Sequence, residues 1–254
     1  MAEVAYNLDD DDLPVGDLLA AQPYPGDGNV WRAVVHTCGG KTQVMLKLLD
    51  PRRLFIECLC ALVGRNMGLP IPKPYLIRIT PAALAQLNLH GSVMGFGSEL
   101  VSIPSLARSV RSTHEIDLAL QEWALLRGAI AFDELIANTD RNATNVLISS
   151  SREIHLIDHD QAIPEPMDPT MHVRNELLQI ATRELHTFER RRVERQFADL
   201  DLAPCESAVS LATSSGNLAL LSQDCRGDQI HQFLLERIQH VKMLILEQLK
   251  ALPR

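Results

Sequence analysis

Two aspartates and an asparagine between residues 132 and 161 have the types and spacing that phosphoryl-transfer chemistry requires. Asp140 and Asn145 stand five positions apart, and Asp158 directly follows the apolar run Ile154–Ile157. Phosphoryl transfer needs a carboxylate near the acceptor hydroxyl and oxygen ligands for magnesium. Asp140 suits the first role, as a catalytic base or acceptor-positioning group. Asn145 and Asp158 suit the second, as catalytic metal ligands.

An apolar hairpin is expected between the last two of these residues. Val146–Ile148 and Ile154–Ile157 are predicted strands, and the polar residues between them form the turn. Such a hairpin places Asn145 at its entry and Asp158 at its exit, so that both reach one ion. The alternative is an ordinary polar loop, since short motifs recur by accident. The apolar hairpin with an aspartate at its far end favours the phosphoryl-transfer interpretation.

The stretch FDELIANTDRNATNVLI followed by LIDHDQAI resembles the HipA-like branch of the protein-kinase-like superfamily. It is also similar to the Asn-Thr-Asp-Arg and Ile-Asp segments of phosphatidylinositol 3- and 4-kinases. A second match is GLPIPKP, residues 68–74, which resembles the turn after the corresponding helix in HipA-like proteins. The resemblance implies an α+β fold of the two-lobed protein-kinase type, with a small β-rich N-lobe, a larger helical C-lobe, and ATP and Mg²⁺ in the cleft. Asp158 is followed by His159 and Asp160, so a Phe-Gly switch is not expected.

Upstream, Lys47 and Glu57 are the expected phosphate-binding pair. Lys47 lies in the apolar strand Gln43–Leu49, where a lysine must find a partner or reach solvent. A kinase uses such a lysine to hold the α- and β-phosphates, paired with a glutamate on the next helix, here Arg53–Met67. The alternative is that Lys47 reaches solvent from an edge strand and Glu57 is a solvated helix residue.

Two backbone segments are further candidates for nucleotide binding. The loop that contains Gly26 and Gly28 lies between the first two predicted strands, and its backbone N–H groups can face ATP phosphates. It reads equally well as a surface turn. Backbone groups of Glu99 and Val101, at the connection between the lobes, are expected to meet the adenine edge.

The remaining pattern divides the chain into three parts. Residues 1–14, which include Asp9–Asp12, are expected to form an acidic, disordered tail. Residues 15–101 are expected to form the N-lobe and residues 102–254 the helical C-lobe. Besides those above, the expected strands and helices are Val15–Ala21, Val30–His36, Tyr75–Ile79 and Met94–Val101, and Thr80–Leu89, Glu115–Ala131, Val173–Leu200, Ala203–Thr213 and Gly227–Leu252, with a turn at Ser214–Asn217.

Composition excludes several classes of protein. A net charge of −8 and a pI of about 5.6 argue against a general nucleic-acid binder. The five cysteines lack zinc-ligand spacing, so buried, reduced thiols are expected. No secretory signal or membrane-length apolar run is visible, and a cytoplasmic location follows by default.

The resemblance implies a serine/threonine protein kinase, often the toxin of a toxin–antitoxin pair. A protein substrate and an antitoxin or regulatory partner are therefore expected. One rival is a lipid kinase of the phosphatidylinositol 4-kinase type. The acidic character of this chain argues against that function, because anionic lipid repels an acidic protein. Another rival is a pseudokinase that binds nucleotide as an interaction module. The sequence does not identify the acceptor.

Overall fold

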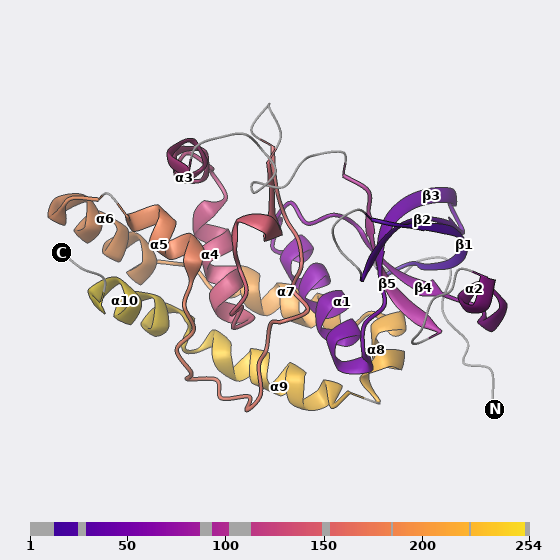
Figure 1. Ribbon diagram of the computed structural model, residues 1–254. Coiled ribbons are helices and arrows are strands. Elements are labelled where there is room, and N and C mark those ends of the chain that lie inside the picture. The colour runs from indigo at the N-terminus through magenta and orange to yellow at the C-terminus, as the bar shows by residue number, and fades with distance from the viewer. Residues whose placement is uncertain are drawn as a thin grey trace.

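The structure is a computed structural model, and it describes residues 13–24, 29–86, 93–101, 113–148, 153–183, 185–223 and 225–251. In Figure 1 the first five strands gather at one end of the molecule. Most of the helices lie at the other end, and α1 runs between the two. The acidic run Asp9–Asp12 lies outside the described residues.

Five strands close into a barrel, which the sequence did not predict. The order around the barrel is β1-β2-β3-β5-β4, and a parallel pairing of β1 with β4, such as Val15 opposite Leu76, closes it. The other pairs are antiparallel. The strands are β1 (Val15–Pro23), β2 (Val30–Thr37), β3 (Gly40–Lys47), β4 (Pro74–Arg78) and β5 (Met94–Glu99).

Alternation along β3 decides which way Lys47 points. Val44 and Leu46 are fully buried and join a separate apolar cluster with residues such as Val35 and Ile77. Because successive side chains on a strand face opposite sides, Lys47 leaves the barrel interior and points away from this cluster. Lys47, at the end of a strand whose apolar side chains are buried, thus reaches polar partners outside the barrel.

Helix α1 (Pro51–Asn66) is the element on which both ends of the molecule pack. Asp50 caps it by accepting a hydrogen bond from the backbone N–H of Arg53, and Pro51 occupies the first turn, where no N–H is needed. Gly68, with φ of 75°, follows its end and allows the chain to turn away. Every residue from Leu54 to Gly64 is buried. The helix is therefore enclosed by the main core rather than lying on its surface.

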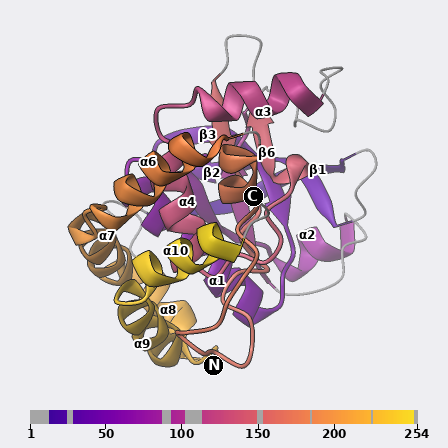
Figure 2. The same cartoon turned by 90° about the vertical axis from the view of Figure 1, so that its left-hand side faces the viewer.

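The helical end is more divided than expected. Each of the three long predicted helices is interrupted. A change in chain direction between buried segments needs no Gly or Pro, so the sequence carries no signal for these breaks. In place of 115–131, 173–200 and 227–252 there are α3 (Thr113–Gln121) and α4 (Leu126–Leu135), α5 (Glu176–Thr182) and α6 (Thr187–Ala198), and α9 (Gly227–Ile238) and α10 (Val241–Ala251). Figure 2 looks onto this end, where α10 lies in front of α4 and packs against it.

Side-chain caps explain where two of these helices begin. Asn175 accepts a hydrogen bond from the backbone N–H of Leu178, which starts α5 at Glu176 rather than at Val173. Ser215 caps α8 (Gly216–Ser222) in the same way, so the expected turn at 214–217 instead opens a helix. The two remaining helices, α2 (Pro81–Gln86) and α7 (Ala203–Thr213), lie where the sequence predicted helices.

The predicted hairpin strands are present. Strands β6 (Val146–Ile148) and β7 (Ile154–Leu156) pair antiparallel, with Val146 opposite Leu156. A single 3-10 turn, Ala143–Asn145, leads into β6. The turn predicted between β6 and β7 falls largely on residues 149–152, which lie outside the described part of the chain.

The predicted tail extends too far into the folded chain. Leu13 is fully buried in the main core, and its carbonyl accepts a hydrogen bond from the side chain of Asn217. The carbonyl of Pro14 accepts one from the backbone N–H of Leu76. An apolar residue next to an acidic run carries no signal that separates these contacts from a solvated tail. No helix within the described ranges has the length and apolar character to cross a membrane.

A buried ion pair ties the helical end together. Arg237 on α9 and Glu134 on α4 are both fully buried, with Nη2 and Oε1 3.0 Å apart. Arg237 also donates to the carbonyls of Pro169 and Met171. The side chain of Gln248 on α10 donates to the second carboxylate oxygen of Glu134. This set of bonds links α4, α9, α10 and the loop before α5, and each buried charge has partners, as burial requires.

Gly64 on α1 is expected to tolerate no side chain. A Cβ built there would lie 2.2 Å from Cδ1 of Ile71 and 3.1 Å from the ring of Phe132. We expect Gly64→Ala to lower the free energy of unfolding by about 1–3 kcal/mol, as overpacking does. Denaturant unfolding measures it. The matched control is Gly128→Ala on α4, whose Cβ would have an ordinary 3.6 Å contact with Leu69. Equal stability of the two variants would contradict the packing argument.

Candidate active site

Lys47 lies between two acidic side chains from distant parts of the chain. Its Nζ is 2.6 Å from Oδ1 of Asp158 and 3.7 Å from Oε1 of Glu57. The expected Lys47–Glu57 pair is therefore present, but the nearer partner is Asp158. Burial alone would lower the pKa of Lys47; the attraction of Glu57 and Asp158 outweighs burial and raises that pKa, so the ammonium keeps its charge.

Glu57 is held by the backbone as well as by Lys47. Its Oε2 accepts a 2.6 Å hydrogen bond from the backbone N–H of His159. Burial raises the pKa of the Glu57 carboxyl to about 7, although Lys47 opposes the rise. Glu57 thus joins α1 both to strand β3 and to the segment that follows β7.

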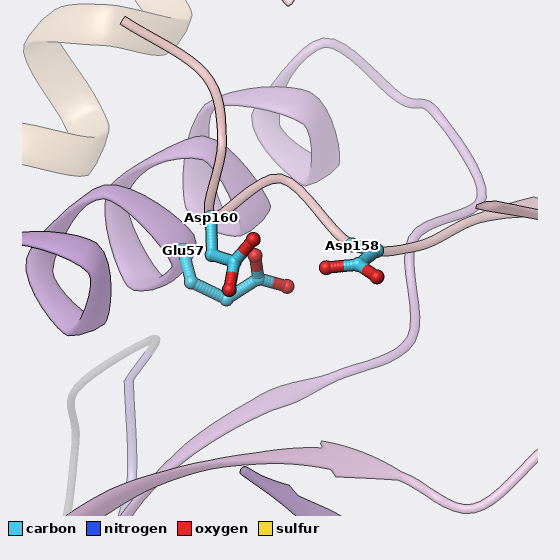
Figure 3. Close-up of side chains that lie close together, drawn as sticks. All are labelled: Glu57, Asp158 and Asp160. Atoms are coloured by element: carbon cyan, nitrogen blue, oxygen red, sulfur yellow. The ribbon is translucent and has the colours of Figure 1, made fainter. Parts of the chain in front are cut away.

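Asp158 and Asp160 bring two more carboxylates to the same place. Figure 3 shows that the Asp160 carboxylate lies beside that of Glu57, and that Asp158 points toward both. Ligand oxygens of the three residues lie within 4.8 Å of one another. Asp158 has φ of 63°, a left-handed conformation that is uncommon outside glycine, asparagine and aspartate. Asp160, for which no role was predicted, is bound by Arg53, with Arg53 Nη2 2.6 Å from Asp160 Oδ2.

His159 lies deeper than a polar surface contact. Its side chain is buried, and within the described chain neither ring nitrogen has a hydrogen-bond partner. The ring packs edge-on against Phe132, with centroids 5.5 Å apart. Burial, reinforced by the charges of Arg141 and Lys47, holds the pKa of His159 well below its usual range. The neutral ring therefore fills space behind Glu57.

Asp140 lies on an exposed loop, and neighbouring residues hold it in place. Its backbone N–H donates to Oδ1 of Asn138, and its carbonyl accepts from the side chains of Asn142 and Asn145. Asn145 Nδ2 also lies 3.2 Å from Asp140 Oδ2. The five-position spacing therefore has a direct geometric meaning, because the asparagine at its end orients the aspartate at its start.

Arg141 orients this loop from within the protein. Its guanidinium binds both carboxylate oxygens of Asp133 at 2.9 Å, and both side chains are 1% exposed. The same group donates to the carbonyls of Asn145 and Ile157 at 2.9 and 2.8 Å. The sequence left open whether Arg141 contacts phosphate or orients the loop, and these contacts favour the second role. Asp133 was missed, although an acid inside an apolar helix is a signal for such a partner.

Asn145 and Asp158 lie at adjacent ends of the hairpin. The backbone N–H of Ile157 donates to the carbonyl of Asn145 at 3.1 Å, and Asp158 is the next residue. An amide oxygen and a carboxylate are both hard oxygen ligands of the kind Mg²⁺ prefers. The Asp158 side chain is 35% exposed, so it is accessible to a ligand. The donor set therefore fits Mg²⁺, with Asn145 and Asp158 as the residues that would hold it.

The other nucleotide-binding candidates have different outcomes. Gly26 and Gly28 lie outside the described residues. Glu99 ends β5, and its backbone N–H donates to the carbonyl of Lys73 at 2.9 Å, so this N–H belongs to the sheet rather than to an adenine edge. Val101 lies two residues after the end of the strand and stays a candidate for the adenine contact.

The Arg141–Asp133 contact is expected to determine whether the loop is stable. Arg141→Met leaves the Asp133 carboxylate buried and unpaired, which should lower the free energy of unfolding by about 3–5 kcal/mol. Denaturant unfolding checks the value. The control is Arg174→Met, since Arg174 pairs with Glu176 at the surface and should contribute less than about 1 kcal/mol. The double variant Asp133→Leu/Arg141→Met should recover part of the loss, and no recovery would contradict the ion-pair explanation.

Comparison with known proteins identifies a family and a fold for this chain. A family model described as HipA-like kinase matches residues 44–207. No curated protein sequence matches the chain. The solved structure of the Helicobacter pylori proinflammatory kinase CtkA is similar at 11% identity and a TM-score of 0.53, over 92% of this chain and 97% of that one. The likeness shows that this chain has a kinase-like α+β fold.

A second solved structure is more distant. The Rio2 kinase of Chaetomium thermophilum, in a complex with ADP/Mg²⁺ and phosphoaspartate, has 15% identity and a TM-score of 0.40, over 89% of this chain and 72% of that one. A likeness at this level carries no argument about the site. Similarity to phosphatidylinositol kinases stays a prediction. The HipA-like model spans Lys47, Glu57, the Asp140 loop and Asp158 and covers more than half of the sequence, so the chain belongs to the HipA-like kinase family.

Proposed function

We propose that this chain is an ATP- and Mg²⁺-dependent kinase that transfers a phosphoryl group to a serine or threonine hydroxyl of a protein. One observation carries the proposal. Lys47 and Asp158, 111 positions apart, meet at 2.6 Å, and the hairpin links Asp158 to the loop that presents Asp140. A phosphate-binding cation, a metal-binding carboxylate and a base are the parts that phosphoryl transfer needs.

Each residue has a distinct role in this proposal. Lys47 binds the phosphates through donors not used by Asp158, and Glu57 keeps its ammonium in place. Asn145 and Asp158 hold Mg²⁺, which would offset the charge of the phosphates when bound. Asp140 accepts the proton of the acceptor hydroxyl, or orients that hydroxyl for attack, and Asn145 keeps the Asp140 carboxylate turned toward it.

The acceptor is the least constrained part of the proposal. A serine or threonine acceptor, a toxin role and an antitoxin or regulatory partner come from the family resemblance. A phosphoinositide acceptor and a nucleotide-binding module without transfer are the rival functions. Incubation with labelled ATP and Mg²⁺, and with casein-like protein, phosphoinositide or the chain alone, separates the three. Label on protein supports the proposal, whereas label on lipid alone or on nothing contradicts it.

The first prediction for this mechanism separates transfer from nucleotide binding. Asp140→Ala should lower kcat by about 10²-fold or more, because a positioned base is lost. ATP affinity should change little, since Lys47 and the metal ligands are intact. Turnover and calorimetric ATP affinity test both parts. Asp199→Ala, an exposed aspartate at the end of α6, is the control. Equal losses of turnover and affinity would show that Asp140 supports the nucleotide site or the fold instead.

The second prediction concerns the metal. Asp158→Asn should lower transfer by about 10²-fold or more and weaken the binding of ATP in Mg²⁺, because a neutral amide is a poorer ligand for the ion. Binding of ATP in the presence of a chelator should change much less. Calorimetry in the two conditions measures the difference. Asp17→Asn, which removes a carboxylate paired with Arg78 on the barrel, is the control. A wild-type turnover rate in Asp158→Asn rules out this metal site.

A further inference from the structure

Side chains in the first turn of α1 bind the segment that follows the hairpin. Arg53 Nη2 binds Oδ2 of Asp160 at 2.6 Å. Its neighbour Arg52 donates from Nη2 to the carbonyl of Ile163 at 2.7 Å, and its Nε lies 3.2 Å from Glu165. One turn further along, Glu57 accepts from the backbone N–H of His159. Residues 159–165 are therefore fastened to α1 by both side-chain charge and backbone hydrogen bonds.

In this part of the chain the backbone is left-handed at Asp158 and Ile163, and it is strained at Ile163. Asp158 and Ile163 have φ of 63° and 51°, in the left-handed region that a β-branched residue such as isoleucine rarely adopts. Ile163 is held there because its N–H donates to the carbonyl of Ile136 and its own carbonyl accepts from Arg52. Strained backbone persists only where the surroundings over-determine it. Asp160 lies between Asp158 and Ile163, so its bond to Arg53 anchors the chain between these two residues.

Charge gives the Arg53–Asp160 pair a second effect. The Asp160 side chain is 5% exposed and its carboxylate lies within 4.8 Å of those of Glu57 and Asp158. Among the described residues that contact these three carboxylates, Lys47 and Arg53 are the cations. Without Arg53, the charge of Asp160 would repel Asp158 and compete for Lys47. With Arg53 bound, Lys47 stays with Glu57 and Asp158.

We propose that Arg53 and Asp160 are a positioning pair, which fixes Asp158 against α1 and thereby holds Lys47, Glu57 and Asp158 in register for phosphoryl transfer. The inference rests on the proposed kinase function and assigns both residues a role through Asp158. It gives Asp160 a role through its bond to Arg53, whereas ligation of a metal ion by the second oxygen of that carboxylate is the alternative that the test separates from it.

The test compares Arg53→Gln, Asp160→Asn and the double variant in steady-state transfer, with thermal unfolding measured for each. We expect each single variant to lower kcat/KM for Mg·ATP by about 10²-fold, since a misplacement of about 1 Å has this effect. The double variant should lose no more than the worse single variant, because the two residues act as one unit. Arg53→Lys, which keeps the charge, should recover most of the loss even where its unfolding temperature equals that of Arg53→Gln.

The control is Arg78→Gln. Arg78 makes a comparable pair with Asp17 between β4 and β1, and its side chain is 41% exposed, as is that of Arg53. The kcat/KM of Arg78→Gln should equal that of the wild type. If Arg53→Gln and Asp160→Asn are folded and transfer phosphate at the wild-type rate, the inference is wrong while the proposed function stands. If Asp160→Asn alone loses activity and Mg²⁺ dependence, Asp160 is a metal ligand and the pair has no positioning role. A wild-type protein with no transfer activity overturns the function and the inference together.

Discussion

The partly buried ammonium of Lys47, whose side chain is 17% exposed, is the constraint on which the rest of this structure depends. A cation removed from water must be matched by anions at short distance, or its burial is too costly to persist. Its partners come from helix α1 and from the segment after strand β7, so the barrel, the helix and the hairpin must meet at one point. The three carboxylates there repel one another. Lys47 neutralises only part of their negative charge, and Arg53 offsets a further part. The site is thus balanced by partners that the sequence holds far apart.

The helices that support the polar groups of the site pack in the main apolar core. Helix α1 is buried along eleven consecutive positions, and α4, behind the Asp140 loop, is buried from Ala129 to Leu135. Phe132 connects the two helices, since it packs close to Gly64 on one side and to His159 on the other. Precision in such a site comes from side chains whose neighbours leave them one position.

Two buried arginines have structural roles that resemble each other. Arg141 binds Asp133 and the carbonyls of the loop, while Arg237 binds Glu134 and the carbonyls of Pro169 and Met171. Their partners, Asp133 and Glu134, are consecutive residues on α4 and therefore point in different directions, about 100° apart around the helix. In both places a planar guanidinium satisfies several acceptors at once, which an ammonium does less well. Arg141 fixes the loop that carries Asp140, and Arg237 fixes the loop before α5.

The sequence by itself determined the local parts of this protein. The five-position spacing of Asp140 and Asn145, the apolar strands of the hairpin, and the strand with Lys47 followed by the helix with Glu57 are all short-range patterns, and the structure contains each of these elements. Only the tertiary structure decided what is set by contacts between distant residues. The closure of the barrel by β1 and β4, the breaks in three long helices, the burial of Leu13 and the preference of Lys47 for Asp158 belong to this class. The pairs Arg141–Asp133 and Arg53–Asp160 do too, because a charged side chain reads the same in sequence whether it is solvated or buried against a partner.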